Sequence, residues 1–285
     1  MSGSLDIDLL RSFTVIAESG SLSRAASRVG RTQSALSMQM KRLEDTLNQP
    51  LLLRTGRGVQ LTAQGERLLP HAQRILRSHD EAMAELSGKG LSGTIRFGCP
   101  DDYAAVFLPS LLRDFASQHP QVLVEVICTV SPRLLEQLDT HAVDLAMISQ
   151  PDDPGTEGVI RREPLVWVAS QGTAVADFDL LPLALSHPDT LDHQAARRTL
   201  EEQGRAYRVA YASSSLAGLT ALVRSGQAIA VLTQTAVPDD LQILPPSAGL
   251  PELPGVGITL RFDKDSPSAL VTAFADHIRS ILPAL

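Results

Sequence analysis

The chain has 285 residues, of which 44% are hydrophobic and 20% charged, and its formal net charge is −7. This composition can form a sizeable core, so it excludes a globally disordered protein. The charge is distributed unevenly: residues 1–90 carry 12 Lys and Arg against 9 Asp and Glu, whereas residues 91–285 carry 13 against 23. A basic N-terminal part in an acidic protein predicts two separate functions, one of them binding to a polyanion.

Several further classes of protein are excluded by the sequence. Asp6, Asp8 and Arg11 interrupt the apolar stretch that a signal peptide would need, and no apolar run is long enough to span a membrane. Two cysteines, Cys99 and Cys128, are too few for a disulfide framework or a zinc module. Motifs for a nucleophile elbow, a zinc protease or a phosphate-binding loop are absent. We therefore expect a cytoplasmic protein that is not an enzyme, binds no metal or cofactor and does not contact a membrane.

The first 61 residues predict three helices followed by a β-hairpin. Apolar residues recur at helical spacing up to Gly20. A short second helix is expected to begin at an N-cap on Ser23, and a third helix to begin after Thr32. Two short strands, 51–53 and 59–61, are joined through glycines that suit a hairpin turn. A tight turn between the second and third helices is typical of a helix-turn-helix, and the hairpin is a candidate wing.

A long helix is expected from Thr62 onward. Its apolar positions alternate by four and three residues, and Pro70 is expected to bend it or disturb one turn. We call these positions the dimerisation stripe: Leu68, Ala72, Ile75, His79, Ala82 and Leu86. Such spacing predicts packing against a partner helix, and the alternative is packing on the helix's own domain. The glycines of residues 88–93 predict a linker that ends this helix.

From Thr94 onward, candidate strands alternate with candidate helices. The strands are 95–98, 122–130, 143–148, 166–169, 184–185, 208–211, 229–232 and 257–261, and the helices lie around 108–115, 134–138, 216–224 and 270–281. This alternation predicts an α/β domain with largely parallel sheets. Ligands of such domains bind at the carboxyl ends of the strands.

The stretch SGSLSRAASRVGRTQSALSMQMKRLEDTLNQPLLLRTGRGVQLTAQGERLL resembles the DNA-binding region of LysR-type transcriptional regulators. It carries the T-Q-S-A-L-S opening of the third helix, the L-E pair at that helix's core face and the L-T-x-x-G entry to the linker helix. The downstream alternation resembles the family's effector-binding domain, which is similar to type 2 periplasmic binding proteins. Within the family, GCPDDYAAVFLPSLL resembles the branch that contains the regulators LrhA and HexA.

The resemblance implies an α + α/β architecture in three parts. Residues 1–61 would form a winged helix-turn-helix, 62–92 a linker and dimerisation helix, and 93–285 the effector-binding domain. Its subdomain I would comprise about 93–163 and 264–285, and its subdomain II about 164–263. The expected partners are double-stranded operator DNA, a small-molecule effector, further copies of the chain in a homodimer or homotetramer, and RNA polymerase. The narrower branch implies control of motility or virulence-type genes.

The candidate DNA-contacting residues lie on the outward face of the third helix and on the wing. They are Thr32, Gln33, Ser34, Ser37, Met38, Lys41, Arg54 and Arg57. The Gln33 amide suits adenine in the major groove, Ser37 suits a base edge or a phosphate, and Met38 suits a thymine methyl group. Between Arg24 and Arg67 there are 8 basic and 3 acidic residues. The alternative interpretation is an ordinary solvated helix face.

Most of the candidate effector-binding residues follow predicted strands, where helix N-termini attract small polar ligands, and the family resemblance adds Thr233 and Trp167. They are Asp101, Asp102, Ser131, Ser149, Gln150, Trp167, Ser213, Ser214 and Thr233. The alternatives are helix capping for Asp101, Ser131 and Ser213, and a place in the core for Trp167. Two adjacent carboxylates repel an anion, so we expect a neutral or cationic effector, or a cleft filled by the protein's own side chains.

Two other functions remain as alternatives. Cys99 and Cys128 follow strands that are expected to be neighbours, so they could form a redox switch in a redox-responsive regulator. The competing interpretation is that both are small buried apolar residues, as is usual in a reducing compartment. A solute-binding protein without a transcriptional role would need an export signal and no helix-turn-helix, and the sequence meets neither condition.

Overall fold

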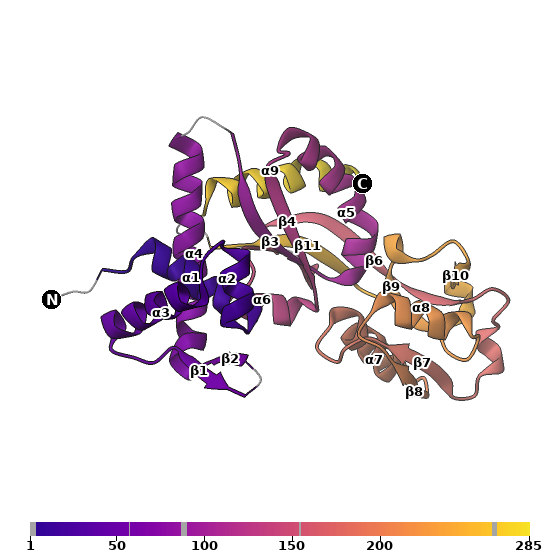
Figure 1. The fold of residues 1–285 in the computed structure, drawn as a ribbon. Helices are drawn as coiled ribbons and strands as arrows, with labels where there is room; N and C mark the ends of the chain where they lie inside the picture. Colours follow the sequence, from indigo (N-terminus) through magenta and orange to yellow (C-terminus); the bar gives the residue numbers. More distant parts are fainter. Residues whose placement is uncertain (1–3, 57, 87–89, 154, 264–266) are drawn as a thin grey trace. The chain divides into compact units, whose positions relative to one another are not determined.

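The computed structural model describes residues 4–285 except 57, 87–89, 154 and 264–266. The described chain forms two compact units, and each is considered by itself. The first comprises the residues up to Gly93 together with 140–142, and the second comprises 94–139 and 143–285 (Figure 1). Among the described residues, no helix is both long enough and apolar enough to cross a membrane.

The first unit contains four helices and a β-hairpin among its described residues. They are α1 (Ile7–Ser19), α2 (Leu22–Arg28), α3 (Gln33–Leu47), β1 (Leu52–Thr55), β2 (Gly58–Leu61) and α4 (Ala63–Leu86). The predicted cap of α3 is confirmed, since the Thr32 hydroxyl accepts a hydrogen bond from the Ala35 N–H at 3.2 Å. The predicted cap of α2 is wrong: Ser21, not Ser23, accepts from the Arg24 N–H. The earlier start places Leu22 inside the helix and in the core, where it is buried.

The core of the first unit joins all four helices. Leu10, Phe13, Leu36 and Leu43 are fully buried in it, together with Ala72 from α4. Burial of these side chains supplies the main driving force for folding this small unit.

The wing is held against the helices by close backbone contacts. The Val59 N–H donates to the Gly20 carbonyl at 2.9 Å, and a Cβ on Gly58 would lie only 2.4 Å from that oxygen. At the start of α4, a Cβ on Gly65 would lie 2.3 Å from the Leu51 carbonyl oxygen. Both positions require glycine because no side chain fits between the two backbones.

Helix α4 continues through Pro70, and the two halves of the dimerisation stripe differ in their surroundings. Ala72 is buried, and Leu68 and Ile75 pack half-buried against the core of the same unit, as the alternative interpretation held. The unpredicted Leu76 is buried there as well. The second half of the stripe, which is His79, Ala82 and Leu86, is exposed. An ion pair of 2.6 Å between Arg11 and Asp80 also fixes α4 to α1.

The second unit is a mixed α/β fold. Its elements are β3 (Gly93–Cys99), α5 (Asp101–Gln118), β4 (Val122–Cys128), α6 (Ser131–Asp139), β5 (Leu145–Pro151), β6 (Val159–Ser170), β7 (Leu181–Leu185), α7 (Leu191–Gln203), β8 (Tyr207–Ala212), α8 (Leu216–Arg224), β9 (Ala230–Thr233), β10 (Leu241–Ile243), β11 (Gly255–Arg261) and α9 (Ala269–Ile281), with 3₁₀ turns at Val175–Asp177, Gln234–Ala236, Pro246–Ala248 and Leu282–Ala284. The main sheet has the order β10-β6-β11-β5-β3-β4, with β9 also paired to β6, and β7 pairs with β8.

The expectation of largely parallel sheets is wrong for the main sheet. β3 pairs in parallel with β5, and β7 with β8. However, β11 runs antiparallel to both β5 and β6, and β9 and β10 run antiparallel to β6. The cause is non-local, because β11 returns from the far end of the chain and enters the sheet between β5 and β6.

Two subdomains share strand β6. Its first half pairs with β11, and its second half pairs with β9 and β10. Because β11 also pairs with β5, residues 255–261 belong to subdomain I. The expected return to subdomain I at about residue 264 stays a prediction, and this pairing supports an earlier return, at Gly255. The core of this subdomain includes the buried rings of Phe97, Phe107, Phe115 and Phe274, which join the sheet to α5 and α9.

Candidate functional sites

The exposed face of α3 carries the predicted DNA-contacting residues of that helix. Gln33, Ser34, Met38 and Lys41 are exposed. Met38 has a relative solvent accessibility of 73%, the highest among the large apolar residues of this helix. The buried residues Leu36, Met40 and Leu43 occupy the opposite face. The predicted division of α3 into an inward stripe and an outward face is therefore confirmed, and the DNA-contacting roles of the outward residues stay predictions.

The wing is hydrogen-bonded to the same exposed face. Arg54 on β1 donates from Nη2 to the Ser37 hydroxyl at 2.5 Å. Ser34, Ser37, Met38, Lys41 and Arg54 together line one open groove between α3 and the wing. Arg57, the second wing residue that the sequence suggested, lies outside the described residues. The groove therefore presents hydroxyls, a thioether and two cations on one surface, beside the carboxylates of Glu44 and Asp45.

A residue that sequence reasoning did not assign fixes the wing at its other end. Glu44 Oε1 accepts hydrogen bonds from the N–H groups of Leu51 and Leu52, at 2.7 and 3.1 Å. The carboxylate thus ties the C-terminal half of α3 to the start of β1. The L-E pair at residues 43–44 was the available signal, but its partner was not evident from spacing.

The basic residues of this unit fall into two groups. Arg28 pairs with Glu18 at 2.8 Å, and Arg24 donates to the Ser19 carbonyl at 2.6 Å, so both are engaged by groups of their own unit. Lys41 and Arg54 make no ion pair with the described residues and face the groove. Unpaired cations on an exposed surface are suited to phosphate groups.

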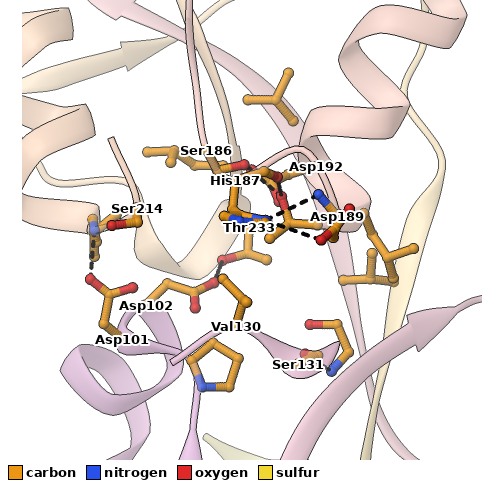
Figure 2. A pocket seen from close by; sticks show the side chains of 18 of the residues that line it. Asp101, Asp102, Val130, Ser131, Ser186, His187, Asp189, Asp192, Ser214 and Thr233 are labelled. Atoms are coloured by element: carbon orange, nitrogen blue, oxygen red, sulfur yellow. Dashed lines mark hydrogen bonds and ion pairs between the residues drawn. The ribbon is translucent and has the colours of Figure 1, made fainter. Parts of the chain in front are cut away.

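A second candidate site is a cavity of about 200 Å³ between the two subdomains of the second unit. Figure 2 shows its walls, which come from the start of α5, the β4–α6 connection, the β7–α7 loop, the start of α8 and the end of β9. Six of the nine predicted effector-binding residues line it: Asp101, Asp102, Ser131, Ser149, Ser214 and Thr233. The structure therefore brings together residues from five separate segments of the chain.

Two adjacent carboxylates on α5 bond across this cavity to subdomain II. Asp101 Oδ2 accepts a hydrogen bond from the backbone N–H of Leu216 at 2.6 Å. The Thr233 hydroxyl donates to Asp102 Oδ2 at 3.3 Å (Figure 2). Asp101 therefore caps a helix, as the alternative interpretation held, but the helix is α8 in the opposite subdomain.

The pKa of the Asp102 carboxyl is shifted toward neutral pH. Burial raises the pKa of its carboxyl to about 7, and the negative charges of Asp192 and Asp101 act in the same direction. Hydrogen bonds from the Tyr103 N–H and the Thr233 hydroxyl oppose the shift. The charge of Asp102 consequently changes within the physiological range of pH.

The serines on the subdomain I wall connect α6 and α5 to β5. The Ser149 N–H donates to the Ser131 hydroxyl at 3.0 Å, and the Ser149 hydroxyl is 2.7 Å from the Tyr103 hydroxyl. These bonds orient both serine side chains at the cavity wall. Ser131 thus links two elements and is more than a local helix cap.

Three of the predicted effector-binding residues do not line the cavity. Trp167 is buried, and its indole N–H donates to the Pro251 carbonyl at 2.8 Å, which places it in the core. The Gln150 amide is occupied by Arg261 at 2.9 Å and by the Glu157 carbonyl. Ser213 hydrogen-bonds within the turn before α8. For Gln150 and Ser213, a position after a strand did not place the side chain at the cavity.

The sequence reasoning missed the wall formed by the β7–α7 loop. This wall comprises Ser186, His187, Asp189, Thr190, Leu191 and Asp192. Ser186 donates to the Asp192 carboxylate, and its hydroxyl is 2.6 Å from that of Thr190. Thr190 directly precedes α7, so a helix-start signal was present in the sequence.

Comparison with known proteins assigns the family. Residues 88–283 match the LysR substrate binding domain, and residues 7–66 match the bacterial regulatory helix-turn-helix protein of the lysR family. The chain belongs to the LysR family of transcriptional regulators. As a member of this family it is a DNA-binding transcriptional regulator with an effector-binding domain, and not an enzyme.

Individual relatives agree with this LysR-family assignment. The HTH-type transcriptional regulator DgdR of Burkholderia cepacia is 70% identical over 282 residues, covering 99% of this chain and 96% of DgdR. The HTH-type transcriptional regulator PecT of Dickeya dadantii is 30% identical, covering 97% and 87%. The crystal structure of full-length CbnR complexed with its target DNA has the same fold, with a TM-score of 0.64, 23% identity and coverage of 97% and 99%.

In this LysR-family chain the cavity has an acidic character. Its described lining includes four aspartates, Asp101, Asp102, Asp189 and Asp192, but no lysine or arginine. His187 lies beside Asp189, with 3.5 Å between Nδ1 and the carboxylate. Most of the remaining wall is apolar, with Leu135, Leu165, Leu219 and Val231 among its residues.

The two cysteines of this regulator lie side by side at the ends of β3 and β4. Both are free thiols, with Cys99 buried and Cys128 exposed. Burial raises the pKa of each thiol, and the neighbouring thiol raises that of Cys99 further. A raised pKa disfavours the thiolate, which is the form that reacts with oxidants.

Proposed function

We propose that this LysR-family regulator binds double-stranded operator DNA through α3 and the wing, using the candidate DNA-contacting residues named above. The observation that carries the assignment is the hydrogen bond from Arg54 to Ser37. It fixes the wing beside the exposed face of α3, so base contacts and backbone contacts come from a single rigid surface. In a winged helix-turn-helix, the second helix of the motif enters the major groove.

Selection from a pool of randomised duplexes, followed by binding titrations of the selected operator, tests this proposal. Gln33→Ala should relax the preference at one base-pair position and cost about 1–3 kcal/mol of binding free energy. Lys41→Gln should weaken binding to all sequences and reduce the slope of log affinity against log salt by about one. Gln203→Ala, in an exposed position of the second unit, is the control. Unchanged base preference in Gln33→Ala and an unchanged salt slope in Lys41→Gln would contradict the assignment.

The exposed half of the dimerisation stripe supports a proposed homodimer, which could pair further into a tetramer. His79, Ala82 and Leu86 are solvent-exposed on α4, and the Leu86 side chain is 86% accessible. A dimer would place two helix-turn-helix modules on a palindromic operator. Ala82→Glu should shift the sedimentation coefficient to that of a smaller species and weaken operator binding, whereas an unchanged oligomer would contradict this role for α4. Contact with RNA polymerase remains a prediction from the resemblance.

The cavity between the subdomains is the proposed effector site. Its two cross-cavity hydrogen bonds, from Leu216 to Asp101 and from Thr233 to Asp102, carry the proposal. A ligand that changes these contacts has different affinities for the open and closed arrangements, which is the requirement for regulation. Ser214→Trp would block the exposed mouth of the cavity and should abolish the transcriptional response to effector. A retained response in this variant would place the effector elsewhere. Control of motility or virulence-type genes remains a prediction.

A further inference from the structure

Two carboxylates face the cavity from opposite subdomains. Asp102 is on α5 of subdomain I, and Asp192 is in the first turn of α7 of subdomain II. Figure 2 shows both side chains at the same cavity, on separate walls. After burial, the charge of Asp192 is the strongest influence on Asp102, ahead of that of its neighbour Asp101.

Hydrogen bonds hold both carboxylates in position without neutralising them. Thr233 donates to Asp102, and Ser186 donates to Asp192. Neither carboxylate has an ion pair with a described lysine or arginine, and the described lining contains none. Because like charges repel strongly where water is largely excluded, a proton or a cation between them lowers the energy of the site.

The rest of the cavity indicates what kind of cation fits. Leu135, Leu165, Leu219 and Val231 supply apolar wall to the same cavity. No cluster of described residues has the arrangement of a metal site. Burial of a ligand's hydrocarbon part against apolar walls is energetically favourable. A volume of about 200 Å³ limits the ligand to a small molecule.

We propose that the effector is a small organic amine whose ammonium group lies between Asp102 and Asp192 and whose hydrocarbon part packs on Leu135, Leu165, Leu219 and Val231. This inference rests on the proposed function of the cavity as the effector site. Because Asp102 and Asp192 belong to different subdomains, an ammonium group between them draws the two walls together. Ligand binding and closure of the subdomains are then the same event.

Binding is coupled to the proton on Asp102. The titratable groups that face this carboxyl are Asp101 on its own helix, Asp192, Asp189 and His187 on the opposing loop, and Tyr103 and Cys99 beside it. An ammonium group favours the charged form of Asp102, whose pKa is otherwise raised to about 7. The charged fraction of a carboxyl with a pKa of about 7 rises about tenfold from pH 6 to pH 8, so affinity for an amine should rise about tenfold as well.

Matched sets of probes test the charge of the ligand on the full-length protein. Each set has one hydrocarbon skeleton and three head groups: isobutylamine, isobutanol and isobutyrate; cyclohexylamine, cyclohexanol and cyclohexanecarboxylate; benzylamine, benzyl alcohol and benzoate. We expect at least one amine to raise the melting temperature and to bind in calorimetry, more weakly at pH 6 than at pH 8. Its alcohol and carboxylate should bind at least tenfold more weakly.

Two variants separate this inference from the proposed function. Asp192→Asn should reduce amine affinity at least tenfold, whereas Asp239→Asn, which removes an exposed charge outside the cavity, should not. If alcohols or carboxylates bind best and Ser214→Trp abolishes their binding, the cavity is the effector site but the amine proposal is wrong. If no probe of any charge binds, or if Ser214→Trp leaves binding unchanged, the cavity is not the effector site and the amine proposal is wrong as well.

Discussion

The carboxylate of Asp101 lies 2.6 Å from the backbone nitrogen of Leu216, the first residue of helix α8, and accepts its hydrogen bond. The helix also has a local cap, because the Ser215 hydroxyl accepts from the Gly218 N–H at 3.2 Å. Two of the unpaired donors at this helix end are thus satisfied, one by each subdomain. The arrangement makes a helix terminus part of the contact that closes the cavity.

Removing this contact should loosen the second unit. Asp101→Ala leaves the Leu216 N–H without its charged acceptor, and we expect the free energy of unfolding to fall by about 1–3 kcal/mol. Urea denaturation of the full-length protein measures the change. Asp101→Asn keeps an acceptor oxygen and should lose less. Equal stability of the Ala variant and the wild type would show that water replaces the carboxylate.

The stability of the protein should depend on pH through Asp102. The pKa of this carboxyl is about 7 in the folded chain, against about 3.9 for an unfolded aspartate. The folded state binds its proton more tightly, so stability is fully present below about pH 4 and is lost as pH rises through 7. Asp102→Asn removes this loss and should be more stable than the wild type at pH 8 but not at pH 4. Thermal unfolding at both pH values, with Asp239→Asn as the control, provides the measurement; an equal difference at the two pH values would contradict the shift.

Glu44 should affect DNA binding without contacting DNA. Glu44→Ala removes the acceptor for the N–H groups of Leu51 and Leu52, so the wing loses its fixed position beside α3. We expect operator binding to weaken by about 1–3 kcal/mol, with base preference at the α3 positions unchanged. Glu44→Gln retains one acceptor oxygen and should retain most of the affinity. If the Ala variant binds normally, the wing is positioned by its other contacts.

Gly65 should tolerate no side chain. A Cβ at this position would lie 2.3 Å from the Leu51 carbonyl oxygen, which belongs to backbone and cannot rotate away. Gly65→Ala should therefore destabilise the first unit by about 2 kcal/mol or more. Gly56→Ala is a matched control, since its Cβ would meet no atom within 4 Å. Similar melting temperatures for the two variants would refute the close approach.

The cysteines should react slowly with oxidants. Burial and a raised pKa keep Cys99 as a thiol, and Cys128 is exposed but its pKa is raised as well. Alkylation followed by mass spectrometry at pH 7 should label Cys128 slowly and Cys99 not at all in the folded protein. Operator binding should be the same after peroxide and after reductant. Rapid disulfide formation between the two residues would instead favour the redox-responsive alternative.

Local signals explain which parts of the first unit were predictable. The cap at Thr32 and the inward stripe through Leu36, Met40 and Leu43 depend on residues within one helix, and the structure confirms them. Ser21 and Ser23 are equally good caps by residue type. Tertiary burial of Leu22 decided between them, and this information is not local.

The cavity shows where local reasoning fails. Helix α7 was not predicted because its buried face consists of His193, Thr199 and Leu200 with two alanines, so its apolar pattern is weak. Because α7 was not predicted, the cavity wall that contains Asp192 was not predicted either. The antiparallel insertion of β11 likewise depends on pairing between residues about 100 positions apart, which spacing along the chain does not reveal.

Strand β6 is continuous from Val159 to Ser170 and serves both subdomains. The subdomains are therefore joined here by hydrogen-bonded sheet and not by a free loop. Its partner β11 has a register irregularity between Ile258 and Thr259, where the ladder can absorb additional twist. A ligand that closes the cavity must work against the torsional stiffness of this ribbon. We therefore expect the two subdomains to twist relative to each other by an amount that increases with binding energy. A rigid-body rotation about a flexible hinge is not expected.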